Sequence, residues 1–262
     1  MTRRVVAAAV AFAATSVVLG FLALPIVAVF ARVSPAHLVE QLNDGVVIDA
    51  LMVTLKTTAI AQSLVLLLGT PTAYVLARRF VGREALVTLV ELPLVLPPAV
   101  AGLGLLAAFG RAGLLQTSFP FTQTAVVLAV AFVSGPLYIR AAIAAFEGVD
   151  ANVVAASRTL GAGITRTFFR VVLPLARTGL AAGAALALAR GIGEFGATIM
   201  FAGSLRGVTQ TLSLAVYSEF DVDFDVALAL SALLVVISAA LLITLKWLPS
   251  LSTSRFRFAT SS

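Results

Sequence analysis

Cysteine is absent from this sequence and histidine occurs only once, which removes side chains on which many reactive sites depend. Without cysteine, the 262-residue chain has no disulfide, no zinc–thiolate centre and no thiol nucleophile. The single histidine, His37, lies in a polar connector at residues 34–49, and one imidazole does not build a metal cluster. Thiol chemistry and histidine-based metal clusters are therefore excluded.

Charge is also scarce, and this scarcity indicates the environment of the protein. Charged residues make up 11% of the chain and hydrophobic residues 60%, with a mean hydropathy of +1.08. A soluble domain typically carries about 25% charged residues to cover its surface. The apolar residues gather in runs long enough to cross a hydrocarbon core about 30 Å thick. The composition predicts a polytopic membrane protein with lipid as its surroundings.

Hydropathy predicts an all-α fold with six transmembrane helices. The expected spans are residues 5–31, 51–77, 85–109, 122–145, 179–202 and 226–247. The first run follows two arginines like a signal peptide, but it is too long and lacks a clean cleavage site, so we expect an uncleaved span.

The distribution of basic residues predicts the orientation of the chain. With the N-terminus inside, 13 Lys and Arg residues fall in inner segments, and outer segments hold 3, namely Arg32, Arg111 and Arg206. Lys56 and Arg190 lie in or near the membrane. Because basic residues accumulate on the cytoplasmic side, both termini are expected in the cytoplasm. The net charge of +6 is explained by topology, and no nucleic-acid partner is expected.

One long inner loop, residues 147–177, has a pattern of its own. Residues 151–160 favour a short helix ending at Gly161, a suitable C-terminal cap. A second amphipathic stretch, residues 164–173, is expected to stop at Pro174. Two short helices around a glycine suit docking to a soluble partner, and an amphipathic hairpin lying on lipid is the alternative.

Three prolines lie close together in the third span, in the segment Glu91-Leu-Pro-Leu-Val-Leu-Pro-Pro98. Proline in a bilayer helix frees backbone carbonyls that neighbours or cavity water must satisfy. The cluster predicts that this span is bent or broken near a pathway, with Pro97 and Pro98 as candidate pathway residues.

The hexapeptide GIGEFG, residues 191–196, matches G-x-G-x-x-G, the fingerprint of a dinucleotide-binding turn. That fingerprint requires a preceding strand in a βαβ unit. The residues before Gly191 form an alanine-rich helical span instead. The match is therefore interpreted as chance, and a nicotinamide-dependent oxidoreductase is excluded.

Two charged residues near this hexapeptide are candidates for the pathway or gate. Arg190 and Glu194 are four residues apart, a spacing that places them on one helical face. An internal ion pair is the favoured interpretation, and direct anion binding by Arg190 stays open. Glu194 would repel a dianion and is interpreted as a structural or gating acid. Thr198 is a further candidate for the gate.

The 147–177 loop resembles the coupling loop of ABC importer permeases. In that family E-A-A is followed by three residues, a glycine, nine residues and I-x-L-P. Here Gly161 is followed by nine residues and then by Val171, Val172, Leu173 and Pro174. Counting back from Gly161, the E-A-A positions fall on Ala155, Ala156 and Ser157. The family glutamate is thus alanine in this chain.

Three further blocks resemble segments of the permeases for molybdate, tungstate and sulfate. The segment 91–102 is similar to their L-P-L-V-L-P-P block. Residues 193–203 and 209–212 are similar to their G-E-F-G-A-T-x-x-F-A-G and T-x-T-L blocks. The matches cover about residues 54–247 in the family's order and spacing. The resemblance is strongest to the molybdate subgroup.

This resemblance implies a type I ABC importer permease fold and a set of partners. It implies an N-terminal helix and external connector at residues 1–50, the type-1 transmembrane domain at 51–247, and a short cytoplasmic tail at 248–262. It further implies a homodimer, two cytoplasmic ATPase subunits docked through residues 151–174, and an extracytoplasmic protein that delivers the oxyanion. The implied coupling residues are Ala155, Ala156, Ser157, Gly161, Val171, Leu173 and Pro174.

The chain has no G-x-x-x-x-G-K-[ST] phosphate loop, so it is expected to hold no cofactor and to leave ATP hydrolysis to a partner. The alternative function is a secondary carrier or channel for a small anion that works without an ATPase. The choice among molybdate, tungstate and sulfate stays open, because these anions share shape and charge.

Overall fold

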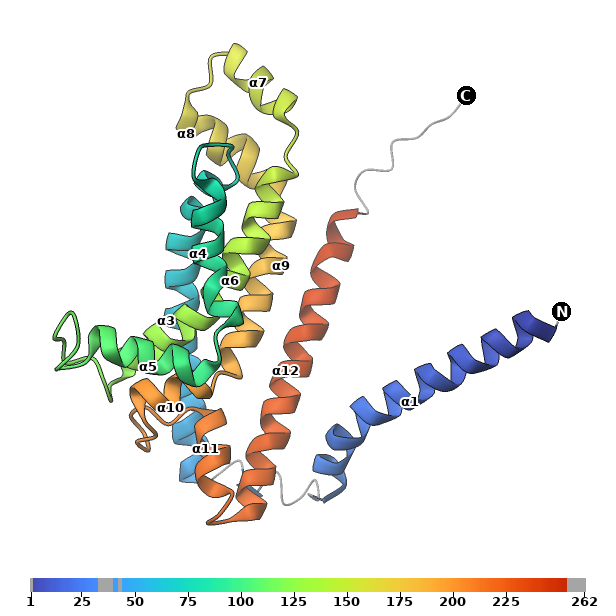
Figure 1. The fold of residues 1–262 in the computed structure, drawn as a ribbon, viewed down its shortest axis with the longest axis vertical. Helices are drawn as coiled ribbons and strands as arrows, with labels where there is room; N and C mark the ends of the chain where they lie inside the picture. The colour runs from blue at the N-terminus through green and yellow to red at the C-terminus, as the bar shows by residue number, and fades with distance from the viewer. Residues whose placement is uncertain (1, 33–39, 42–43, 254–262) are drawn as a thin grey trace.

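The computed structural model describes residues 2–32, 40–41 and 44–253, and every regular element in this part of the chain is helical (Figure 1). The helices are α1 (Thr2–Arg32), α3 (Gly45–Leu76), α4 (Arg83–Val95), α5 (Pro98–Phe109), α6 (Gln123–Glu147), α7 (Ala151–Thr159), α8 (Ile164–Thr167), the π-helix η1 (Phe168–Val172), α9 (Leu173–Ile192), α10 (Gly196–Ala202), α11 (Leu212–Glu219) and α12 (Phe224–Thr253). His37 and the tail residues 254–262 lie outside the described residues.

The predicted all-helical fold is confirmed, and the six predicted spans agree with the structure when the bent pair α4–α5 is counted as one span. Five helical segments within the described residues are long and apolar enough to cross a membrane, and the bent pair α4–α5 makes a sixth. The second span begins at Gly45, and Asp44 caps it by accepting a hydrogen bond from the Val46 N–H. The last span, α12, extends to Thr253 and so includes part of the predicted tail.

The predicted limits of the fifth span, residues 179–202, are wrong. The helix that crosses here is continuous from Ile164 to Ile192. Pro174 therefore does not end a separate loop helix. A proline lacks an N–H and its ring collides with the carbonyl four residues earlier, but the wider π-helical turn η1 directly precedes α9, in which Pro174 is the second residue. The helix then ends before Gly193.

The break predicted from the proline cluster is confirmed in the third span. Helices α4 and α5 meet at an angle of 114°. Leu96 and Pro97 each precede a proline, a position that disfavours helical backbone, and their ψ angles are 136° and 134°. Two consecutive extended residues turn the chain, and α5 runs across the bundle rather than along it (Figure 1).

The core forms around α6, which packs between α3 and α9. Small residues allow this close approach on the α9 side. A Cβ added at Gly179 would lie 2.6 Å from the Ala145 Cβ, and one added at Gly183 would lie 2.7 Å from the Ala141 Cβ. Glycines four apart facing alanines four apart make the small-residue interface that membrane helices use for tight contact.

The two ends of the bundle differ, and α1 lies apart from it. Helices α7 and α8 cap one end, and α10 and α11 lie at the other (Figure 1). Helix α1 contacts α12 and is otherwise exposed, with Phe12 at 76% exposure and Phe21 at 75%. Its apolar surface therefore faces lipid or another protein chain.

The α6–α9 interface predicts the effect of enlarging one glycine. Gly183→Leu should destabilise the bundle by about 1–3 kcal/mol, because the added side chain overpacks the contact with α6. The measurement is the thermal unfolding midpoint of the protein in detergent. Gly104→Leu is the matched control, since a Cβ at Gly104 meets no atom within 4 Å. Equal midpoints for the two variants would contradict this account of the interface.

Candidate functional site

The short helix α7 protrudes from one end of the bundle, and its own residues define both of its limits. The Asp150 side chain accepts a hydrogen bond from the Asn152 N–H at 2.8 Å and so caps the N-terminus. After α7, the N–H of Ala162 bonds to the Ser157 carbonyl and the N–H of Gly161 bonds to the Arg158 carbonyl. This is a Schellman motif, and Gly161 has the positive φ of 84° that the motif requires.

The predicted coupling residues divide between α7 and the helix below it. Ala155 and Ala156 are exposed on α7, and Ser157 is half-buried. Val171 lies in η1, and Leu173 and Pro174 open α9, so these three belong to the spanning segment.

Helix α7 is joined to the bundle through a pair of hydroxyl groups. Ser157 Oγ lies 3.1 Å from Thr167 Oγ1, and Thr167 is only 2% exposed. The next residue, Phe168, packs its ring 4.7 Å from Tyr74 and 6.2 Å from Phe146, measured between centroids. An aromatic cluster from α3, α6 and η1 thus lies directly beneath α7. The sequence patterns did not indicate this cluster.

A single arginine ties three helix ends together at the same end of the bundle. Arg83 Nε donates to the Leu76 carbonyl at 2.7 Å, and the guanidinium also pairs with Glu84 and Glu147. Helices α3, α4 and α6 therefore share one connection. This contact was also missed from sequence, since it joins residues far apart in the chain.

The second candidate region lies where α9 ends and α10 begins. Glu194 is 2% exposed, and its Oε1 accepts a hydrogen bond from the Ala197 N–H at 2.7 Å, which caps α10. Its Oε2 lies 2.7 Å from Arg190 Nη1. By distance this contact is an ion pair, although its angles fall short of a hydrogen bond. Arg190 and Glu194 are thus brought together across the last turn of α9.

The other gate candidates, Thr198, Pro97 and Pro98, lie in α10 and at the start of α5. Thr198 is fully buried, and its hydroxyl donates to the Phe195 carbonyl at 2.8 Å within α10. Pro97 is the N-cap residue of α5 and Pro98 its first residue, and a Cβ added at Gly196 would lie 2.5 Å from the Pro98 Cβ. The starts of α5 and α10 therefore touch.

Two of the three glycines of GIGEFG, Gly191 and Gly196, lie at close helix contacts. Helix α9 precedes the hexapeptide where a dinucleotide fold requires a strand. A Cβ at Gly191 would lie 3.0 Å from Val130 Cγ1, and Gly196 meets Pro98. The chance interpretation of the fingerprint agrees with this geometry.

A small cavity opens beside the ion pair. Its volume is about 140 Å³, and it is lined by Pro93, Leu94, Leu96, Pro98, Ala101, Val133 and Arg190. The Arg190 side chain is 35% exposed, whereas the Glu194 side chain is 1% exposed. Arg190 thus lines the cavity with a partly exposed side chain, while the carboxylate of Glu194 is enclosed by protein.

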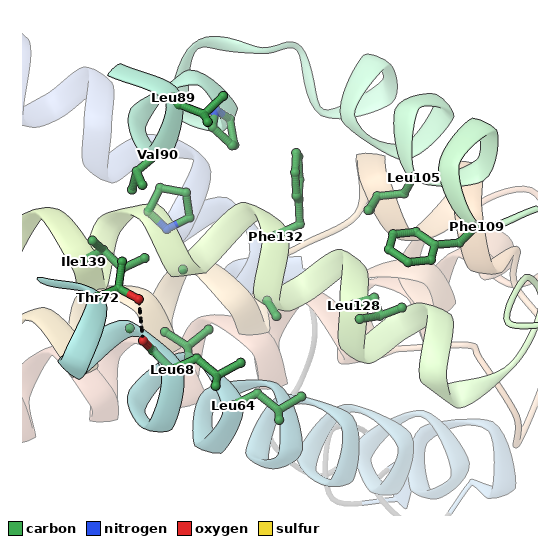
Figure 2. Close-up of a pocket in the computed structure, with 16 residues that line it drawn as sticks. Leu64, Leu68, Thr72, Leu89, Val90, Leu105, Phe109, Leu128, Phe132 and Ile139 are labelled. Carbon is green, nitrogen blue, oxygen red and sulfur yellow. Dashed lines mark hydrogen bonds between the residues drawn. The ribbon is translucent and has the colours of Figure 1, made fainter. Parts of the chain in front are cut away.

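A larger hollow between α3, α4, α5 and α6 has a different character (Figure 2). Its volume is about 420 Å³, and side chains such as Leu68, Leu89, Phe109 and Phe132 line it. The hydroxyl of Thr72 is occupied by a hydrogen bond to the Leu68 carbonyl, drawn as a dashed line in Figure 2. Because no charged residue lines this hollow, it offers nothing to hold an anion.

The block 209–212 joins the loop after α10 to α3. The Leu212 N–H donates to Thr54 Oγ1 at 2.8 Å, and Thr209 Oγ1 accepts from the Leu205 N–H at 3.0 Å. Gln210 Oε1 and Thr211 Oγ1 are buried without a hydrogen-bond partner among the described residues.

The fold defined by these elements is that of an ABC transporter permease. It matches a chain of a bacterial alginate ABC transporter, solved in complex with an alginate pentasaccharide-bound periplasmic protein, with a TM-score of 0.74 over 93% of each chain at 14% identity. Residues 65–257 match the family model described as binding-protein-dependent transport system inner membrane component. The chain belongs to this family and is a multi-pass membrane permease.

Several relatives resemble the chain over most of its length. The molybdenum transport system permease protein ModB of Mycobacterium tuberculosis is 45% identical over 230 residues, which cover 84% of this chain and 86% of that protein. ModB of Escherichia coli K12 is 38% identical, covering 79% and 95%. The probable transport system permease protein NifC of Clostridium pasteurianum is 34% identical, covering 89% and 85%.

The Schellman motif predicts how α7 responds to substitution at Gly161. A side chain in the left-handed region costs about 1–2 kcal/mol, so Gly161→Ala should loosen α7 and accelerate amide hydrogen exchange there roughly 5- to 30-fold. Gly163→Ala is the matched control, because Gly163 has a φ of −67° and a Cβ there meets no atom within 4 Å. Equal exchange in both variants would exclude the motif as the source of α7 stability.

The buried carboxylate predicts an order of stability at residue 194. Glu194→Ala removes both the ion pair and the cap of α10, and each unpaired buried group costs about 1–3 kcal/mol. Glu194→Gln keeps an oxygen that can accept from the Ala197 N–H, so its loss should be smaller. Thermal unfolding of the three proteins should rank wild type above Gln and Gln above Ala. Indistinguishable Gln and Ala variants would show that the cap contributes nothing.

Proposed function

We propose that this chain forms the membrane pathway of an ATP-driven importer of a tetrahedral oxyanion, with molybdate as the first candidate. The main support for this proposal is the match to proteins named molybdenum transport system permeases, at up to 45% identity over most of this chain and of each relative. Tungstate and sulfate remain competing substrates because they have the same shape and charge.

The protruding helix α7 is the proposed docking element for a cytoplasmic ATPase. It is short, capped at both ends and joined to the bundle through Ser157 and Thr167, so a load on it reaches α9. Ala155 and Ala156 present small, exposed side chains to such a partner. The complete importer would contain two copies of this chain, two ATPase subunits and an extracytoplasmic oxyanion-binding protein.

The division of charge supports a cytoplasmic position for the α7 end. Basic residues belong to the segments that meet there, namely Arg78, Arg79, Arg83, Arg158, Arg166 and Arg170. Three acidic residues, Glu84, Glu147 and Asp150, lie at this end as well, so basic residues outnumber acidic ones there. The opposite end holds the acidic residues Asp44, Asp49, Glu219, Asp221, Asp223 and Asp225. Since basic residues accumulate inside, the proposal has the N-terminal side of α1 and the C-terminal side of α12 in the cytoplasm.

ATP hydrolysis is assigned to the partner subunit, because the sequence has no phosphate-binding loop. This chain would supply the path and its gate. The transmembrane domain of residues 51–247 would hold both, with residues 1–50 adding α1 and the external connector.

The proposal predicts oxyanion uptake by the reconstituted complex. The permease, its ATPase and its binding protein in proteoliposomes should accumulate radioactive molybdate only when ATP is supplied. Excess unlabelled tungstate and sulfate, added separately, rank the three anions. Uptake that proceeds without the ATPase would favour a secondary carrier or channel and reject the proposal.

The same preparation assigns the role of α7. Ala155→Arg combined with Ala156→Arg should reduce ATPase co-purification and uptake together, because two bulky cations cover the proposed docking face. Val81→Arg is the control, since Val81 is fully exposed in the loop between α3 and α4. Normal ATPase binding by the α7 double variant would place the docking face elsewhere.

A further inference from the structure

The cavity at the α4–α5 break is lined by one charged residue, Arg190, and only part of its guanidinium contacts another side chain. Arg190 approaches Glu194 through Nη1. A guanidinium carries five N–H donors, and apart from this ion pair no hydrogen bond joins the Arg190 side chain to the described residues. Arg190 is also one of the residues that line the cavity of about 140 Å³, and its side chain is 35% exposed.

The partner carboxylate is held in a way that leaves the guanidinium available. Glu194 is fixed from the protein side, because its Oε1 accepts the Ala197 N–H at the start of α10. The exposure of the two side chains is correspondingly unequal, 1% for Glu194 and 35% for Arg190. A cation whose counter-ion is buried behind it keeps its open face for a second acceptor.

The start of α5 adds to the positive character of the same cavity. Pro98 is one of the lining residues, and a helix N-terminus carries a partial positive charge. Pro97, at the N-cap position, has no side-chain acceptor for the first free N–H groups of α5. The larger apolar hollow has neither feature. The cavity lined by Arg190 therefore combines hydrogen-bond donors with enough space for an ion.

The size of this space suits one small ion. Its volume of about 140 Å³ far exceeds the ~15 Å³ that a single water molecule requires. A charged side chain within a spanning segment is expensive to place, and it marks ion or substrate pathways. An arginine fork also matches the paired oxygens of an oxyanion better than a lysine does.

We propose that Arg190 is a transit contact for the imported oxyanion, which binds the free guanidinium donors in the cavity at the α4–α5 break while Glu194 retains the opposite side. This inference rests on the proposed import function. Glu194 limits the grip of the site, because its negative charge repels a dianion across a short distance. A pathway site must bind strongly enough to admit the ion and weakly enough to release it.

The absence of native cysteine allows a direct test in the full-length permease. Leu96→Cys places a thiol in the cavity lining, and Leu68→Cys places one in the apolar hollow. Each variant, in lipid nanodiscs, is treated with an anionic and a cationic methanethiosulfonate reagent of similar size. The ratio of anionic to cationic reaction rates should be about fivefold higher for Leu96→Cys than for Leu68→Cys, because Arg190 attracts anions.

Substitutions at the ion pair then identify the source of the preference. Adding R190Q to Leu96→Cys should lower the ratio to that of Leu68→Cys, whereas R190K should retain most of it. E194Q should raise it, since the competing carboxylate is gone. Millimolar molybdate should slow modification of Leu96→Cys severalfold and lose this effect with R190Q, and the same concentration of chloride should have no effect.

The labelling needs neither ATP nor partner subunits, so its outcome is separate from that of the uptake experiment. An unchanged rate ratio and unchanged molybdate protection in the R190Q background would overturn the transit contact, even if uptake succeeds. If the labelling gives the expected result but no ATP-driven uptake is found, the oxyanion contact at Arg190 stands. The import function, on which its transit role rests, is then rejected. If Arg190 has only a structural role, R190Q should lower thermal stability but leave the protection of Leu96→Cys by molybdate intact.

Discussion

Backbone N–H groups in an apolar medium must find acceptors, and this requirement determines where polar residues occur in the bundle. Each interruption of a span exposes such groups, because the first turn of a helix has no internal partners for them. Glu194 supplies the acceptor at the start of α10, and Thr54 supplies it for Leu212 at the start of α11. The buried polar side chains near the 193–212 segment are therefore first of all the consequence of helix breaks.

Those breaks are possible because the scaffold beside them is tightly packed. Helices α6 and α9 approach through Gly179 and Gly183, and α10 approaches α5 through Gly196. Small residues replace the hydrophobic driving force that lipid surroundings do not supply between helices. With that support, α5 can run across the bundle and leave a cavity in which Arg190 is only partly enclosed.

Local chemistry made some features predictable, and tertiary contacts made others unpredictable. Six spans follow from hydropathy, the α4–α5 break from Pro97 and Pro98, and the end of α7 from Gly161, since each depends on neighbouring residues alone. The limits of the fifth span were predicted wrongly because proline usually ends a helix, whereas here a π-helical turn accommodates Pro174 within a continuous helix. The aromatic cluster and the Arg190 cavity join distant segments, and no local pattern encodes them.

The two candidate regions are connected by a single element. The helix from Ile164 to Ile192 begins beside α7 and ends two residues after Arg190, a length of roughly 40 Å at 1.5 Å per residue. At its upper end Thr167 contacts Ser157, and at its lower end Arg190 holds Glu194 and hence α10. In the proposed importer, a displacement of α7 by an ATPase would therefore move the ion pair through one continuous helix. In this proposal the load passes through the hydroxyl contact and the helix itself, a path that does not include the side chain at position 155.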